Sequence, residues 1–177
     1  MNKTLTTTAV AAALLASLTA CSSGSSSSSQ HTSNGNAGAS ATPAASKPLD
    51  ASSAFTQLAA KVPTAKLSGT VTAANDGNHL LGRPGQYTSK ITFTDTRIKA
   101  ADVEGLEKGD VTRGGSIEAF ATAADAQTRA KYVEDVTKSM PALAEYDYVH
   151  GTVLVRVSHL LTPAQAAAYK TAADGLS

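Results

Sequence analysis

Acidic residues are absent from the first 49 positions of this 177-residue chain, and all 14 Asp and Glu side chains lie at Asp50 or beyond. Residues 22–47 consist almost entirely of Ser, Gly, Ala, Asn and Thr, with no aromatic residue. Such a segment buries too little apolar surface to offset the entropy of ordering it. We therefore expect a disordered tether over residues 21–47 and a single domain of ordinary size over residues 48–177.

The only cysteine, Cys21, follows directly on Leu18-Thr19-Ala20 and on the apolar run that begins at Ala9. A short apolar segment that ends in small residues is typical of a secretory signal peptide and its cleavage site. A cysteine just past that site matches a bacterial lipobox. We therefore predict a lipoprotein signal peptide over residues 1–20 and a lipid anchor on Cys21, carrying acyl chains such as palmitate. The domain is then expected on the outer face of the cell membrane.

Two other interpretations of the N-terminal region were weighed against lipidation. A transmembrane helix needs roughly 20 apolar residues, and the run that ends at Leu18 offers about half of that. A secreted protein cut at an ordinary site would carry a free thiol on Cys21, which is an awkward group in an oxidising compartment. Lipidation accounts for both the short apolar run and the placement of the cysteine.

Charge restricts the partners of the domain. Residues 48–177 contain 13 Lys and Arg against 14 Asp and Glu, with no strongly basic or acidic block. This balance predicts no nucleic-acid binding and no membrane contact apart from the lipid on Cys21. With a single cysteine, the chain has no internal disulfide, so the domain must be stabilised by a hydrophobic core.

The pattern of apolar residues predicts alternating strands and helices. Apolar residues at three- and four-residue spacing indicate a helix over 49–62. Alternation of apolar and polar residues indicates strands over 67–73 and 87–98. The strand over 87–98 is expected to be half-buried, with one face formed by Tyr87, Ser89, Ile91 and Phe93. A loop over 99–113 precedes a strand over 115–120 and a helix capped by Thr122. Residues 146–149 and 152–158 form two strands, or one strand with a bulge, and a capping box at Thr162 opens the last helix.

These elements predict an α+β fold. We expect a four- to five-stranded antiparallel or mixed sheet, with about three helices packed on one face. Much of the apolar burial must come from a small set of large side chains, namely Phe55, Leu58, Ile91, Phe93, Ile117, Phe120, Val153, Val155 and Val157.

Recognisable catalytic motifs are missing from the sequence. Gly114-Gly115-Ser116 enters a strand rather than leaving one, so it does not fit a nucleophile elbow. The sequence contains neither a phosphate-binding loop nor a dinucleotide fingerprint, and its histidines are too scattered to indicate a metal site. We therefore predict no catalytic residue, metal or cofactor, and we lean toward a non-enzymatic protein.

A long polar loop between two predicted strands, Asn75 to Tyr87, is the best candidate for binding. It carries Asp76, Asn78, His79, Arg83 and Tyr87 among glycines, and loops on a rigid scaffold often carry function. Arg83 could contact a carboxylate or phosphate through two nitrogens. The alternative is structural: Arg83 pairs with an acid such as Asp95, and Pro84-Gly85 is simply a turn.

Three sequence blocks carry a family resemblance. Residues 78–90 (NHLLGRPGQYTSK), 113–118 (RGGSIE) and 145–154 (EYDYVHGTVL) resemble blocks of small, uncharacterised actinobacterial cell-surface lipoproteins. The resemblance covers about Leu67 to Tyr169. It implies export, lipidation and one small α+β domain, but no activity and no site residue.

The sequence therefore favours a lipid-anchored extracytoplasmic domain that binds a protein or small-molecule partner without catalysis. Two alternatives stay open, a cell-envelope hydrolase without a recognisable motif and a structural envelope protein. A deep pocket that holds His79, Arg83 and a carboxyl group with a shifted pKa would favour the hydrolase. An exposed apolar patch would favour a protein partner.

Overall fold

The computed structural model describes residues 48–177. The predicted signal peptide, Cys21 and the predicted tether lie outside these residues. Three helices and five strands follow in the order α1 (Ala51–Lys61), β1 (Ala65–Thr70), β2 (Ser89–Asp95), β3 (Gly114–Ala119), α2 (Ala123–Lys138), β4 (Glu145–His150), β5 (Val153–Ser158) and α3 (Pro163–Asp174). Short 3-10 turns occur at Ala100–Val103, Val111–Arg113 and Pro141–Leu143. Among residues 48–177, no helix combines the length and apolar character that crossing a membrane requires.

The strands form one antiparallel sheet in the order β1-β2-β3-β5-β4. The α+β class and the five-stranded sheet are therefore confirmed. Residues 145–158 form two strands joined at Gly151, rather than one strand with a bulge. As a result β5 lies between the central strand β3 and the edge strand β4.

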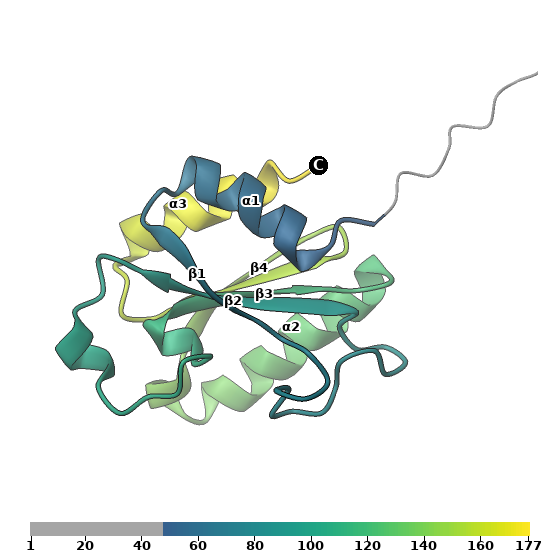
Figure 1. Cartoon of the computed structure of the whole chain (residues 1–177), viewed down its shortest axis with the longest axis horizontal. Coiled ribbons are helices and arrows are strands. Elements are labelled where there is room, and N and C mark those ends of the chain that lie inside the picture. Colours follow the sequence, from purple (N-terminus) through teal and green to yellow (C-terminus); the bar gives the residue numbers. More distant parts are fainter. Residues whose placement is uncertain (1–47) are drawn as a thin grey trace, which may run out of the picture. The chain divides into compact units, whose positions relative to one another are not determined.

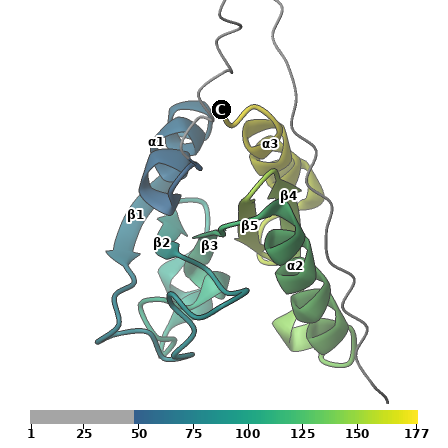
Figure 2. The same ribbon diagram turned by 90° about the vertical axis from the view of Figure 1, so that its right-hand side faces the viewer.

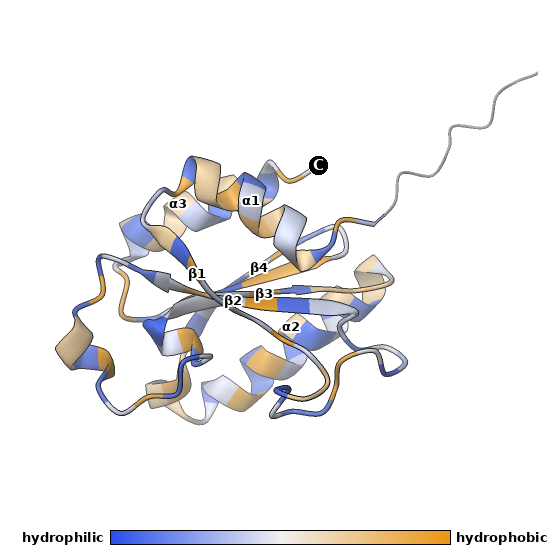
Figure 3. Cartoon of the chain, in the orientation of Figure 1, coloured by the Kyte–Doolittle hydropathy of each residue, from blue (hydrophilic) through white to orange (hydrophobic). Residues whose placement is uncertain are grey.

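The helices lie on both faces of the sheet. Figure 1 shows α1 and α3 above the sheet and α2 below it, and Figure 2 shows the same separation from the side. The expectation that all three helices pack on one face is therefore wrong. Figure 3 shows hydrophilic residues alternating with hydrophobic ones along α2, and only Ala126 and Val133 of this helix are buried. A sheet face rich in charged side chains accommodates such a helix.

The main core lies between the sheet and the pair α1 and α3. The Phe93 ring stacks on Tyr169 with 5.5 Å between ring centroids and contacts Phe55 at 5.8 Å. The Tyr169 hydroxyl donates a hydrogen bond to the Asp95 carboxylate at 2.6 Å. The same carboxylate also accepts from the Arg97 guanidinium at 2.6 Å. The predicted core residues are all buried except Phe55, which is partly buried. One of them, Phe120, belongs to a second, smaller hydrophobic cluster on the face of the sheet that α2 covers.

Two strand faces differ from their predictions. Alternation places Leu67 and Gly69 on one apolar face of the first strand. In β1, however, the register with β2 shifts between these two residues, and Leu67 is 56% exposed. The irregularity breaks the simple alternation on which the prediction depended. In β2, Lys90 and Thr92 on the supposedly exposed face are also buried, because α2 and its neighbouring loops cover that face.

The predicted helix starts are confirmed in detail. The Thr122 hydroxyl accepts from the backbone N–H of Asp125 at the start of α2, and Thr162 with Gln165 forms the complete capping box of α3. These local hydrogen bonds satisfy backbone donors that the first helical turn leaves free.

Candidate functional site

The loop over residues 75–87 folds around the Asp76 carboxylate. This carboxylate accepts the backbone N–H groups of Leu80 and Leu81, each at 2.8 Å, and that of Asn78 at 3.2 Å. It also accepts the Tyr87 hydroxyl at 2.6 Å. Burial alone would raise the pKa of Asp76, but these hydrogen bonds outweigh it and lower the pKa to about 2. Asp76 is therefore ionised at neutral pH and organises the loop.

Tyr87 and Asp76 point into the protein rather than toward solvent. The Tyr87 ring is fully buried and meets Phe120 edge-on, with 6.5 Å between ring centroids. Burial, together with the hydrogen bond to Asp76, raises the pKa of Tyr87. Two of the five predicted binding residues therefore stabilise the loop internally and are not available at its surface.

The other three predicted residues are placed differently from one another. His79 and Arg83 are exposed, and within residues 48–177 Arg83 has no ion-pair partner. The proposed Arg83–Asp95 pair is wrong, because Asp95 pairs with Arg97. Pro84 and Gly85 do form a turn, in which Gly85 has a φ of 71° that favours glycine. Asn78 alone reaches the wall of a cavity beneath α2.

We expect Asp76→Ala to lower the free energy of unfolding by about 2–4 kcal/mol, because several donors lose a charged acceptor at once. The amides of Leu80 and Leu81 should also exchange faster with solvent. Urea denaturation and amide hydrogen exchange check both expectations. Arg83→Ala, in the same loop but exposed, is the control and should change stability by less than about 0.5 kcal/mol. Equal stability losses in the two variants would contradict an organising role for Asp76.

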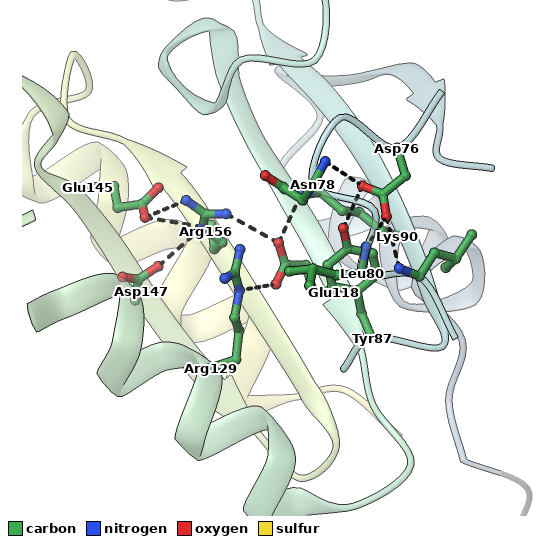
Figure 4. A network of polar contacts seen from close by, with 11 residues as sticks. Asp76, Asn78, Leu80, Tyr87, Lys90, Glu118, Arg129, Glu145, Asp147 and Arg156 are labelled. Carbon is green, nitrogen blue, oxygen red and sulfur yellow. Dashed lines mark hydrogen bonds and ion pairs between the residues drawn. The ribbon is translucent and has the colours of Figure 1, made fainter. Parts of the chain in front are cut away.

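A second polar site lies between the sheet and α2 and is centred on Glu118 of β3. Its fully buried carboxylate accepts from Lys90 Nζ of β2 at 2.9 Å, from Arg129 Nε of α2 at 3.0 Å and from Arg156 of β5 at 3.2 Å. Arg156 also donates to Glu145 of β4 at 2.7 Å. Figure 4 shows these side chains pointing toward one another from four strands and the helix. We call Lys90, Glu118, Arg129, Glu145 and Arg156 the Glu118 network.

The two buried acids near these bases have opposite pKa shifts. Burial alone would raise the pKa of Glu118, but Lys90, Arg156 and Arg129 outweigh it and lower the pKa to about 2. Burial, followed by the negative charge of Glu145, raises the pKa of Asp147 to about 7. Asp147 Oδ1 is enclosed without a hydrogen-bond partner. Glu118 is therefore ionised at neutral pH, whereas Asp147 titrates near neutrality.

The basic members of the Glu118 network line a cavity of about 340 Å³. Lys90, Arg129 and Arg156 contribute from the sheet and α2, and Tyr132 and Leu143 contribute apolar surface. The acids Asp110 and Glu145 also line it. Glu118 itself is not part of the wall, but its three cationic partners are. On the other side of α2, Asp147 and Glu145 line a groove of about 700 Å³ along β4.

The Glu118 network was not predicted from the sequence. The available signal was the placement of Lys90, Glu118 and Arg156 at interior positions of three strands. Alternate polar residues in a strand ordinarily mark a solvent-facing side, and charge type alone does not distinguish that case from a buried ion pair.

The geometry can bind an anion through fixed positive charges, but it does not assemble the enzyme site that the sequence analysis described. His79 and Arg83 are exposed on the loop, and Asp147 lies in the separate groove. In the part of the chain that the structure describes, no three His, Cys, Asp or Glu side chains group as metal ligands. Comparison with family models, curated proteins and solved structures finds no match to this chain.

Proposed function

We propose that this protein is a lipid-anchored extracytoplasmic domain that binds a ligand in the cavity beneath α2, without catalysis. The lipobox-like Leu18-Thr19-Ala20-Cys21 supports the anchor, and the anchor would place the domain on the outer face of the membrane. Mass spectrometry of the mature N-terminus tests the anchor. An acylated Cys21 is the expected result, and an unmodified thiol would contradict it.

The cavity wall is the observation that carries the binding proposal. Lys90 and Arg129 have side chains only 9% and 11% exposed, and their shared partner Glu118 is fully buried. Removing charges from water is costly, and a well-packed apolar group of similar volume often stabilises a fold as well or better. Charges retained at the wall of a cavity are therefore better explained by a ligand than by stability alone.

A thermal-shift screen tests the binding function. The full chain with Cys21→Ser, which lacks the acylation site, is melted in the presence of small polar and charged compounds. A ligand at about 100 times its dissociation constant stabilises the folded state by about 2.7 kcal/mol, which raises the melting temperature by several degrees. If no compound raises it, the proposal fails. Turnover of a bound compound would favour the hydrolase alternative.

A further inference from the structure

We propose that the cavity beneath α2 takes a small organic acid, whose carboxylate or phosphate group faces Lys90 and Arg129 and whose apolar part lies against Tyr132 and Leu143. This inference rests on the proposed binding function and specifies the class of ligand. Three features carry it: hydrogen-bond donors without an acceptor, two basic side chains that share a single carboxylate, and an apolar wall on one side.

Unused donors are the first feature. A lysine ammonium carries three N–H donors and an arginine guanidinium carries five. Lys90 uses one donor and Arg129 uses only its Nε, both on Glu118. Among residues 48–177, the enclosed side-chain polar atoms without a partner are Ser116 Oγ and Asp147 Oδ1. The two terminal nitrogens of Arg129, which also lack a protein acceptor, are therefore open to the cavity or to solvent.

Charge is the second feature. Glu145 pairs with Arg156, whereas Lys90 and Arg129 both depend on the single carboxylate of Glu118. The network therefore has three positive charges against two negative ones. Two further acids lie nearby. Asp147 is 4.0 Å from Arg156 and has a pKa of about 7. Asp110 lines the same cavity as Glu145 and caps a 3-10 turn by accepting from Thr112 N–H. Since Lys90 and Arg129 share one carboxylate, an anion in the cavity would give them a second acidic partner.

The apolar wall is the third feature. Tyr132 and Leu143 line the cavity and are 60% and 54% exposed. The Arg129 guanidinium lies over the Tyr132 ring at 5.5 Å from its centroid, so a cation and an aromatic face adjoin one another. A ligand with an anionic group beside an apolar body matches both surfaces, whereas an inorganic anion would use only one of them.

The ligand class is tested with four probes of similar size and different charge. Benzoate and phenyl phosphate carry an anionic group, benzyl alcohol is neutral and benzylamine is cationic. Their affinities for the full chain with Cys21→Ser are measured by isothermal titration calorimetry. We expect at least one anionic probe to bind roughly tenfold or more tightly than benzyl alcohol and benzylamine, because charge-assisted hydrogen bonds are the stronger ones. Comparison of benzoate with phenyl phosphate distinguishes the two anionic groups.

Three variants locate the binding site. Arg129→Gln should lower the affinity for the anionic probe roughly 10- to 100-fold. Lys131→Gln should leave this affinity unchanged, because Lys131 is an exposed residue of the same helix paired with Asp135. Thermal melts establish that each variant is folded. Tyr132→Ala changes an exposed side chain and should weaken binding by a few-fold without loss of stability, so it tests the site even if Arg129→Gln does not fold.

The outcomes separate the ligand class from the binding function. Benzyl alcohol or benzylamine binding as tightly as the anions would overturn the acidic-ligand inference and leave the binding function standing. The inference also fails if no probe binds when it is present at about 1 mM. It fails as well if the folded Arg129→Gln and Tyr132→Ala variants both bind the anionic probe with unchanged affinity. The binding function fails if the thermal-shift screen yields no ligand.

Discussion

Glu118→Gln should lower the free energy of unfolding by about 3–5 kcal/mol at neutral pH, because removing one partner of a buried ion pair leaves the others uncompensated. The amide is nearly the same size as the carboxylate, so the loss reflects charge rather than volume. Among the described residues, Lys90 and Arg129 have no acidic partner other than Glu118, whereas Arg156 keeps Glu145. Urea denaturation of the full chain with Cys21→Ser measures the difference.

The pH dependence identifies the cause of this loss. The surrounding bases lower the pKa of Glu118 from 4.5 to about 2, so its contribution is fully present above about pH 4.5 and disappears as the pH falls toward 2. Wild type and Glu118→Gln should therefore approach equal stability in acid. Glu134→Gln, which breaks an exposed pair with Lys138, is the control and should cost less than about 1 kcal/mol. A loss that is the same at pH 7 and pH 2.5 would exclude the electrostatic explanation.

The helices and most of the sheet could be predicted because their signals are local. Thr122 and Thr162 cap helices through hydrogen bonds within three residues, and Val153, Val155 and Val157 share a face by simple alternation. The β1 strand shows the limit of this approach. Its irregularity lies between Leu67 and Gly69, and it depends on pairing with β2, which no local pattern encodes.

The second face of the sheet could not be predicted because its stabilising contacts join distant residues. Lys90 and Arg156 reach Glu118 across 28 and 38 residues of sequence. Each charged residue taken alone is typical of a solvent-facing position, and only the strand order β2-β3-β5 brings the three together. On that face α2 contributes Arg129 to the network, and its buried apolar residues are the small set Ala126 and Val133.

The candidate loop shows a similar limit. Residues 75–87 were selected correctly as a polar segment rich in hydrogen-bonding groups, but the sequence did not show which side chains face inward. Asp76 and Tyr87 are both buried, and the Tyr87 hydroxyl donates a hydrogen bond to the Asp76 carboxylate at 2.6 Å. His79 and Arg83 are exposed instead. Asn78 connects this loop to the cavity, so the selected region lies beside the proposed site rather than forming it.

Gly115→Ala should destabilise the domain by about 3 kcal/mol or more, at or beyond the upper end of ordinary overpacking. Gly115 lies opposite Phe93 in the β2–β3 pair and opposite Val157 in the β3–β5 pair. A Cβ at this position would collide with the Phe93 ring and with the Arg156 carbonyl oxygen. The backbone oxygen has little freedom to move, so the strands would have to separate or the Phe93 ring would have to leave its stack on Tyr169.

Gly115 therefore has a steric role at the start of β3, where a side chain would not fit. Gly77→Ala is the matched control, because a Cβ there meets no atom within 4 Å, and we expect a change within about 1 kcal/mol. Thermal and urea melts of both variants measure the difference, and near-ultraviolet circular dichroism reports whether the aromatic stack persists. If Gly115→Ala melts like Gly77→Ala, Phe93 can repack at little cost, and the close packing of Phe93 against β3 does not determine the stability of the core.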